Sequence, residues 1–351
     1  MTSLTVSAER HEEARLRPVP WRRMAWVTWR QHRLGLSAAG ALLAGLALWL
    51  LIAGFRLHHT YAAATACHPA TSLACSELVS RFNGMGQILA YGYVLQPVPA
   101  LIGVFVGVPV LAREFETGTF RFAWTQGFGP WRWTLAKLAA LAVAVVAVAA
   151  AFSALVLWYY GPYLHAGNQA LGLFEVSPLS PGLFDLRGVG FAAWTLVAFA
   201  MGVLAGMLIQ RVLPAIVATF CVFIGLAYVT GAYLRQHYLA PLVTSHPSTW
   251  VMPGSAWVIS KQWVTKDGQP VTQPVLVRVL QGAPPSVAGK GGIPRAFGST
   301  QYLMQHGYTL WTSYQPASRF WPFQFIEGGW LLALSLVLMA ATVWLVRRRR
   351  S

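Results

Sequence analysis

The stretch REFETGTFRFAWTQGFGPWRWTLAK, residues 113–137, decides the fold because it separates two long apolar runs. It is short, aromatic and charged, in a chain with few charges elsewhere. Its charged side chains are Arg113, Glu114, Glu116, Arg121, Arg132 and Lys137. If the flanking runs cross a membrane, this stretch joins two spans and is where we expect a soluble partner to bind.

The composition is typical of a membrane protein. Of the 351 residues, 56% are hydrophobic and 10% are charged, whereas a soluble domain carries about 25% charge. Many of the 16 Trp, 18 Phe and 12 Tyr cluster at the ends of the apolar runs, as in an aromatic belt. The formal net charge is +16, but many basic residues flank the runs, so we expect contacts with membrane lipid and not with nucleic acid.

The apolar runs predict an all-α polytopic membrane protein with six transmembrane helices, since roughly 20 apolar residues cross a hydrocarbon core. The spans are expected at residues 34–55, 88–112, 135–160, 189–209, 212–233 and 325–346. The first five therefore occupy residues 34–233. Pro97, Pro99 and Pro109 interrupt the second span and predict a kinked helix.

Residues 1–33 are predicted to form a cytoplasmic tail that ends in an interfacial amphipathic helix. Helical spacing puts Arg22, Trp26, Trp29 and Arg33 on one face. The Trp rings can lie among lipid headgroups while the guanidinium groups reach water or phosphate. A plain basic flank of the first span is the alternative.

Basic residues set the orientation of the spans. The N-terminal tail, residues 113–137, Arg211 and the RRRRS terminus carry most of the 26 Lys and Arg in short segments. We therefore expect both termini and residues 113–137 to be cytoplasmic. The large segment 234–324 is then extracytoplasmic, and residues 325–351 are the sixth span with a basic cytoplasmic tail.

Cys67 and Cys75 fall in the extracytoplasmic loop after the first span. An oxidising compartment favours a disulfide between them. Two free thiols are one alternative. A metal site with His58, His59 and His68 is another, but that spacing fits no common zinc site, and we expect no metal.

The fourth span contains MGVLAG at residues 201–206. Its Gly202 and Gly206 form a small-xxx-small pair, which suits close contact with another helix. Incidental glycines, common in membrane helices, are the alternative.

Several kinds of chemistry are missing from the sequence. No Asp, Glu, Lys or Arg lies in the middle of a predicted span, and Glu327 is near the outer end of the sixth. Ion-coupled transporters usually keep such groups at the midplane, so a secondary transporter is disfavoured. The segment AGKGGIP, residues 288–294, lacks the spacing of a phosphate loop. We therefore expect no catalytic residues and no cofactor, and energy supplied by another chain.

The segment EFETGT, residues 114–119, resembles the E-x-E-x-G-T signature of permeases in the second ABC exporter superfamily, the type V exporter fold. The six spans, the basic aromatic helix before the first and the outer segment between the fifth and sixth are similar too. The Arg- and Trp-rich N-terminal flank looks like that of actinobacterial members. The resemblance covers most of the chain.

In that family the segment after the second span forms a coupling helix that docks in a groove of the ATPase. The matched positions are Glu114, Glu116, Gly118 and Thr119, with Phe120 beside them. The ATPase-coupling residues implied by the resemblance are Arg113, Glu114, Glu116, Gly118, Thr119, Phe120, Arg121, Phe122 and Trp124. The alternative is that the aromatic residues of this segment lie in the lipid headgroups.

The resemblance implies a plasma-membrane permease of an ATP-driven exporter, working as a homodimer or as a heterodimer with a similar permease. ATP hydrolysis would belong to a separate ABC ATPase subunit, so this chain would not be an enzyme. The mostly apolar spans suggest an amphipathic or lipid-like cargo. The alternatives are a non-transporting membrane sensor or immunity protein and, less favoured, a secondary transporter.

Overall fold

The computed structural model describes residues 21–69, 72–85, 95–118, 130–165, 177–245, 256–284 and 296–348. It is mostly helical, and six of the described helices are long and apolar enough to cross a membrane. These candidate spans are Gly40–Ala66, Val98–Glu116, Trp131–Leu164, Gly188–Ile209, Val212–His237 and Ala317–Arg348. The prediction of six helices that are long and apolar enough to be membrane spans is confirmed.

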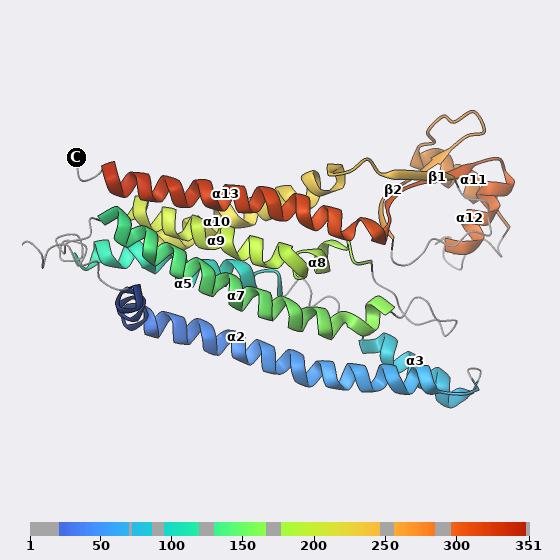
Figure 1. The fold of residues 1–351 in the computed structure, drawn as a ribbon. Helices are drawn as coiled ribbons and strands as arrows, with labels where there is room; N and C mark the ends of the chain where they lie inside the picture. The colour runs from blue at the N-terminus through green and yellow to red at the C-terminus, as the bar shows by residue number, and fades with distance from the viewer. Residues whose placement is uncertain are drawn as a thin grey trace, which may run out of the picture.

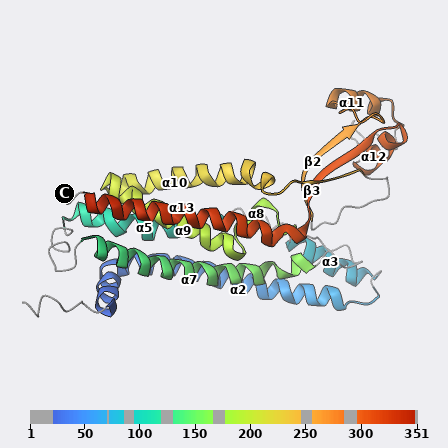
Figure 2. The same ribbon diagram turned by 45° about the horizontal axis from the view of Figure 1, so that its top comes forward.

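Six long helices run side by side as a bundle (Figure 1). They are α2 (Trp21–Ala66), α5 (Val98–Glu116), α7 (Pro130–His165), α9 (Gly188–Ile209), α10 (Val212–Val229) and α13 (Phe320–Arg348). A small sheet lies beyond one end of the bundle, which we call the sheet end (Figure 2). The opposite end, where α5 and α13 finish, is called the C-terminal end.

Helix α9 is the centre of the bundle. It contacts α5, α7, α10 and α13. Its sequence is apolar around the whole circumference, as expected for a helix packed on all sides. Helices α5 and α7, which flank the stretch 113–137, therefore both pack against one central helix.

The contact between α5 and α9 is made by glycines. A Cβ built on Gly103 would lie 2.3 Å from the Cβ of Ala198, so the two backbones approach more closely than larger residues allow. A Cβ on Gly206 would lie 2.7 Å from the carbonyl oxygen of Val108. The close contact predicted for the small residues of α9 is confirmed, and its counterpart in α5 is a second glycine pair, Gly103 and Gly107.

A three-stranded antiparallel sheet lies between α10 and α13 in the sequence, so the all-α prediction is wrong for this segment. Its strands β1 (Leu242–Ser245), β2 (Trp257–Val264) and β3 (Thr309–Gln315) have the order β1-β3-β2. In register, Leu242 faces Tyr314 and Val264 faces Thr309. The two longer strands, WVISKQWV and TLWTSYQ, are rich in β-branched and aromatic residues, which favour strands over helices. Helices α11 (Gln273–Gln281) and α12 (Ala296–Gln305) lie beside the sheet.

Several helix boundaries differ from the predictions. Helix α2 continues to Ala66, past the expected end of the first span, and α3 (Leu73–Met85) occupies part of the expected loop. In α5, Pro97 is the N-cap and Pro99 lies in the first turn, where the missing N–H groups are not needed. Among the described residues, only Pro109 is inside this helix. The expected start of the second span, residues 88–94, lies outside the described residues, so the predicted kink at Pro97 and Pro99 stays a prediction.

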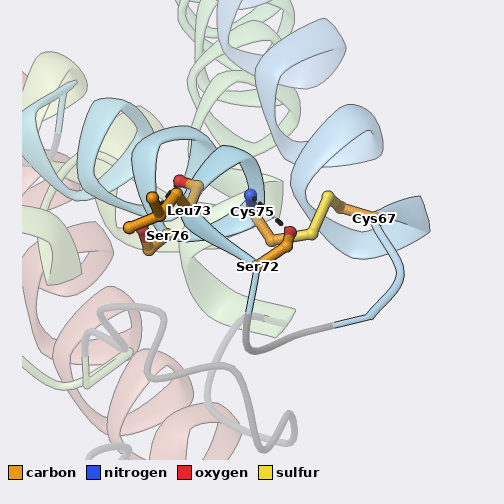
Figure 3. Close-up of a disulfide and its surroundings, with 5 residues drawn as sticks. All are labelled: Cys67, Ser72, Leu73, Cys75 and Ser76. Atoms are coloured by element: carbon orange, nitrogen blue, oxygen red, sulfur yellow. Dashed lines mark hydrogen bonds between the residues drawn. A yellow bond between two sulfur atoms is a disulfide. The ribbon is translucent and has the colours of Figure 1, made fainter.

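Cys67, after the end of α2, and Cys75, in the first turn of α3, form a disulfide (Figure 3). Their Cα atoms are 5.7 Å apart. The backbone N–H of Cys75 donates to the hydroxyl of Ser72 at 3.2 Å. The disulfide therefore holds the start of α3 against the end of α2. In the part of the chain that the structure describes, no group of three His, Cys, Asp or Glu side chains could hold a metal ion.

The first turns of α2, drawn in dark blue, lie at a steep angle to the rest of that helix (Figures 1 and 2). A helix lying in the membrane plane would have such an angle to a span. Residues 1–20 lie outside the described residues. The interfacial position of this segment stays a prediction.

Candidate functional site

The predicted coupling segment begins at the end of α5. Gly118 has a φ of +69°, a left-handed conformation that favours glycine, and it ends the helix there. Thr117 closes the last turn, since both its N–H and its hydroxyl donate to the carbonyl oxygen of Arg113. The predicted residues Thr119, Phe120, Arg121, Phe122 and Trp124 lie outside the described residues.

We expect Gly118→Ala to lower the free energy of unfolding by about 1–2 kcal/mol. A Cβ at this position meets no atom within 4 Å, so the change would act through backbone strain alone. Gly118→Asn is the matched variant, because Asn tolerates the left-handed region better than Ala. Thermal unfolding in mild detergent measures both. Equal melting temperatures for wild type, Gly118→Ala and Gly118→Asn would contradict the left-handed conformation of Gly118.

Glu114 connects α5 to α7. Its Oε1 accepts a hydrogen bond from Nζ of Lys137 at 2.7 Å, and the same ammonium group donates to the carbonyl oxygen of Val110 at 3.2 Å. The Lys137 side chain is only 2% exposed and that of Glu114 is 12% exposed. A buried ammonium group needs such a counter-charge, so this ion pair fixes the position of α7 against the end of α5.

Glu116 connects α5 to α10. Its Oε1 accepts a hydrogen bond from the backbone N–H of Val212 at 2.7 Å. Val212 is the first residue of α10, where N–H groups have no partner within the helix and negative charge is favoured. The turn before it is tight, with Gln210 in the left-handed region. Glu116 therefore caps α10 and holds its start beside the end of α5.

We expect Glu116→Ala to lower the free energy of unfolding by about 1 kcal/mol, the effect of losing one exposed charge-assisted cap. Glu116→Gln keeps an oxygen acceptor and should have a smaller effect. The comparison uses thermal unfolding at low and high salt, since salt screens the helix dipole. A Glu116→Ala protein as stable as wild type at low salt would show that the Val212 contact contributes nothing.

The structure thus brings together Glu114, Glu116, Gly118 and Lys137 at the C-terminal end of the bundle. Both carboxylates bind other parts of the same chain, and Arg113 is exposed. The two glutamates therefore brace the end of α5, at the base of the predicted coupling segment. The sequence motif indicated their importance but gave neither contact, since the partners lie 23 and 96 residues away.

A second polar site lies at the sheet end. Asp185 follows α8 (Pro181–Phe184), Arg235 begins a short 3-10 helix, Arg235–His237, and Glu327 is in the first half of α13. Nη2 of Arg235 donates to Oε1 of Glu327 at 2.8 Å and to Oδ1 of Asp185, and its Nε donates to Oε2 of Glu327 at 3.0 Å. The indole N–H of Trp194 and the hydroxyl of Tyr238 donate to the same Glu327 carboxylate, at 2.9 and 3.1 Å.

In this cluster two carboxylates share one guanidinium group. The side chains of Arg235 and Glu327 are 1% and 0% exposed, whereas that of Asp185 is 23% exposed. Burial is the main reason that the pKa of the Asp185 carboxyl is raised to about 7; Arg235 opposes the rise and the nearby Glu327 carboxylate adds to it. The sequence shows Glu327 near the outer end of the sixth predicted span, but it does not identify the partners Asp185 and Arg235. The available signal is that Arg235 follows the fifth predicted span and Glu327 begins the sixth, so both lie on the same predicted side of the membrane.

A cavity of about 570 Å³ adjoins this cluster, between α5, α9 and α10. We call it the sheet-end cavity. Its wall is formed by Gln96, Pro97, Pro99, Ala100, Pro181, Asp185, Leu186, Trp194, Phe220, Phe223, Ile224, Ala227, Tyr228, Gly231, Ala232 and Arg235. It is mostly apolar and aromatic, with charged groups at one end only.

A family model described as ABC-2 membrane transporter related matches residues 40–235 of the chain. The match covers more than half of the sequence, from α2 to Arg235, and includes the ion pair between Glu114 and Lys137. No curated protein and no solved structure matches the chain.

Proposed function

Because the chain belongs to the ABC-2 membrane transporter related family, we propose that it is the membrane-spanning permease subunit of an ATP-driven exporter in the plasma membrane. A separate ABC ATPase subunit would supply the energy and dock on the segment 113–137. The resemblance to ABC-2 permeases is confirmed by the family match. Export, the docking site and the ATPase partner are the proposed parts.

The observation that carries the proposal is the bracing at the end of α5. A segment that passes force from an ATPase must be rigidly joined to the spans that move. Glu114 accepts a hydrogen bond from Lys137 of α7, and Glu116 accepts one from Val212 of α10, both at 2.7 Å. The close glycine contact also joins α5 to the central helix α9. A displacement of the coupling segment would therefore be passed to four spans together.

The pathway is proposed to form between two such permeases, identical or similar. ATP binding would bring two ATPase subunits together and, with them, two coupling segments. The orientation follows from charge: Arg113, Arg132, Arg347 and Arg348 all belong to helix ends at the C-terminal end of the bundle. Such basic residues favour the cytoplasmic side, which supports the proposal that the sheet lies outside the cell.

Affinity purification from the native membrane tests this function. We expect the tagged full chain, solubilised in mild detergent, to elute with an ABC ATPase and vanadate-sensitive ATP hydrolysis. The double variant Glu114→Ala, Glu116→Ala should reduce ATP-dependent export by about tenfold or more, as expected if about 1.4 kcal/mol of coupling is lost. Glu77→Ala is the matched control, since its ion pair with Arg81 is exposed on α3 and contributes little.

Two results would contradict the proposal. One is the absence of any ATPase from the eluate of a correctly folded permease. The other is export that needs no ATP and is unchanged in the double variant. The first would favour a non-transporting sensor or immunity protein, and the second a secondary transporter.

A further inference from the structure

The sheet-end cavity has the size of a small-molecule site. Its volume of about 570 Å³ lies within the roughly 300–1,000 Å³ of typical ligand pockets. Trp194, Phe220, Phe223 and Tyr228 give its wall a strongly aromatic character. Aromatic faces attract cations as well as apolar groups. The wall by itself therefore accepts either a neutral apolar ligand or a lipophilic cation.

The charged end of the cavity decides between these ligands. Asp185 and Arg235 both line it, but the Asp185 side chain is 23% exposed and the Arg235 side chain only 1%. The accessible charge is thus a carboxylate. With both carboxylates ionised, the cluster of Asp185, Arg235 and Glu327 has one negative charge in excess.

An anion fits this end poorly. Nε and Nη2 of Arg235 already donate to Glu327 and Asp185. Its Nη1 has no hydrogen-bond partner among the described residues. An anion approaching Nη1 would face two carboxylates, whose repulsion opposes the attraction of one guanidinium group.

The cavity can be reached from the outer face of α10. Ile224 and Tyr228 line it and are 61% and 65% exposed in the single chain. Because α10 is a candidate membrane span, these side chains lie at the depth of lipid. A ligand dissolved in the membrane could therefore enter between α10 and its neighbours without crossing water.

We propose that the sheet-end cavity binds a lipophilic organic cation, with its charge against Asp185 and its apolar groups against the aromatic wall. This inference rests on the proposed function, since it names the class of cargo that the permease takes. The Trp194 indole joins the two halves of the site, because it lines the cavity and donates to Glu327.

The site should respond to pH. Burial raises the pKa of Asp185 to about 7, and the charged or titratable groups around it are Arg235, Glu327 and Tyr238. Below that pH the carboxyl is mostly protonated and the excess negative charge is lost. A permanently charged cation should therefore bind about tenfold more tightly at about pH 8 than at about pH 6.

The test uses two probes of the same shape and opposite charge, tetraphenylphosphonium and tetraphenylborate. Each is titrated into the purified full chain in lipid nanodiscs, with empty nanodiscs as the blank for partition into lipid. We expect saturable binding of tetraphenylphosphonium only. Asp185→Asn keeps the shape of the side chain and should weaken this binding by about tenfold or more.

A second variant protects the test against misfolding of Asp185→Asn. Ala227→Trp would fill the cavity through α10, away from the ion cluster, and should abolish binding of the cation while Asp185 stays in place. Gly225→Ala is its control on the same helix, since a Cβ there meets no atom within 4 Å. Melting temperatures and gel-filtration profiles establish that each variant is folded.

Three results would overturn the inference: equal binding of both probes, no saturable binding of the cation, or cation binding unchanged by Ala227→Trp. Because binding is measured without ATP or a partner, it is separate from the proposed coupling. Failure of cation binding with ATP-driven export of another cargo intact rejects this site alone. Cation binding by a chain that has no ATPase partner rejects the proposed coupling alone.

Discussion

Glu114→Gln is expected to lower the free energy of unfolding by about 3 kcal/mol, the lower end of the range for breaking a buried ion pair. The reason is the position of Lys137, whose side chain is 2% exposed and loses its counter-charge. Water at the 12% exposed Glu114 side chain keeps the effect from being larger. Thermal unfolding of the purified chain in mild detergent measures the change.

The double variant Glu114→Gln, Lys137→Met separates charge loss from other effects. Methionine removes the buried ammonium group while keeping an unbranched side chain, so most of the lost stability should return. Glu77→Ala is the control for loss of an exposed ion pair and should change stability by less than about 1 kcal/mol. A Glu114→Gln protein as stable as the Glu77→Ala protein would show that Glu114 does not brace α7.

Gly103→Ala is expected to be the second large effect, with a loss of about 1–3 kcal/mol from overpacking. The new Cβ would lie 2.3 Å from the Cβ of Ala198 and 2.4 Å from its backbone carbonyl carbon, so α5 and α9 would have to separate. Gly107→Ala should act in the same direction, since its Cβ would lie 2.5 Å from the carbonyl oxygen of Phe199. The double variant Gly103→Ala, Gly107→Ala should have a lower free energy of unfolding than either single variant.

The matched controls are Gly45→Ala in α2 and Gly225→Ala in α10, where a Cβ meets no atom within 4 Å. In these open helical positions Ala should be neutral or stabilising, because it has the higher helix propensity. Melting temperatures of the four single variants in the same detergent make the comparison. If the Gly103→Ala and Gly225→Ala variants have the same melting temperature, the close contact of α5 with α9 does not exist in the protein.

The membrane spans could be predicted from the sequence because long apolar runs have few alternatives to a transmembrane helix. Their ends are less predictable: α2 continues past the basic residue Arg56 to Ala66, and the Cys67–Cys75 disulfide then joins its end to the start of α3. The sheet was missed because its strands are short and lie in a polar segment with many turn residues. Strand pairing between β2 and β3 depends on partners about 50 residues apart.

The candidate site was predicted in part. The E-x-E-x-G-T resemblance indicates Glu114 and Glu116, but no sequence pattern shows that Glu114 contacts Lys137 and Glu116 contacts Val212. The Gly103 and Gly107 pair is equally hard to predict, since residues 98–112 of α5 are all apolar or Gly and glycines are common in such helices. The ion cluster of the sheet end joins three distant segments, and only the folded chain brings them together.

The central claim is that the segment after α5 contacts an ABC ATPase, and site-specific photo-cross-linking in the native membrane tests it most directly. A photoreactive phenylalanine analogue is placed at Phe122, and in a control chain at Phe105, which is 46% exposed within the α5 span. We predict that Phe122 forms a cross-link to an ABC ATPase and Phe105 does not. A folded, membrane-inserted chain that forms no such cross-link from Phe122, or the same cross-link from both positions, would contradict the account.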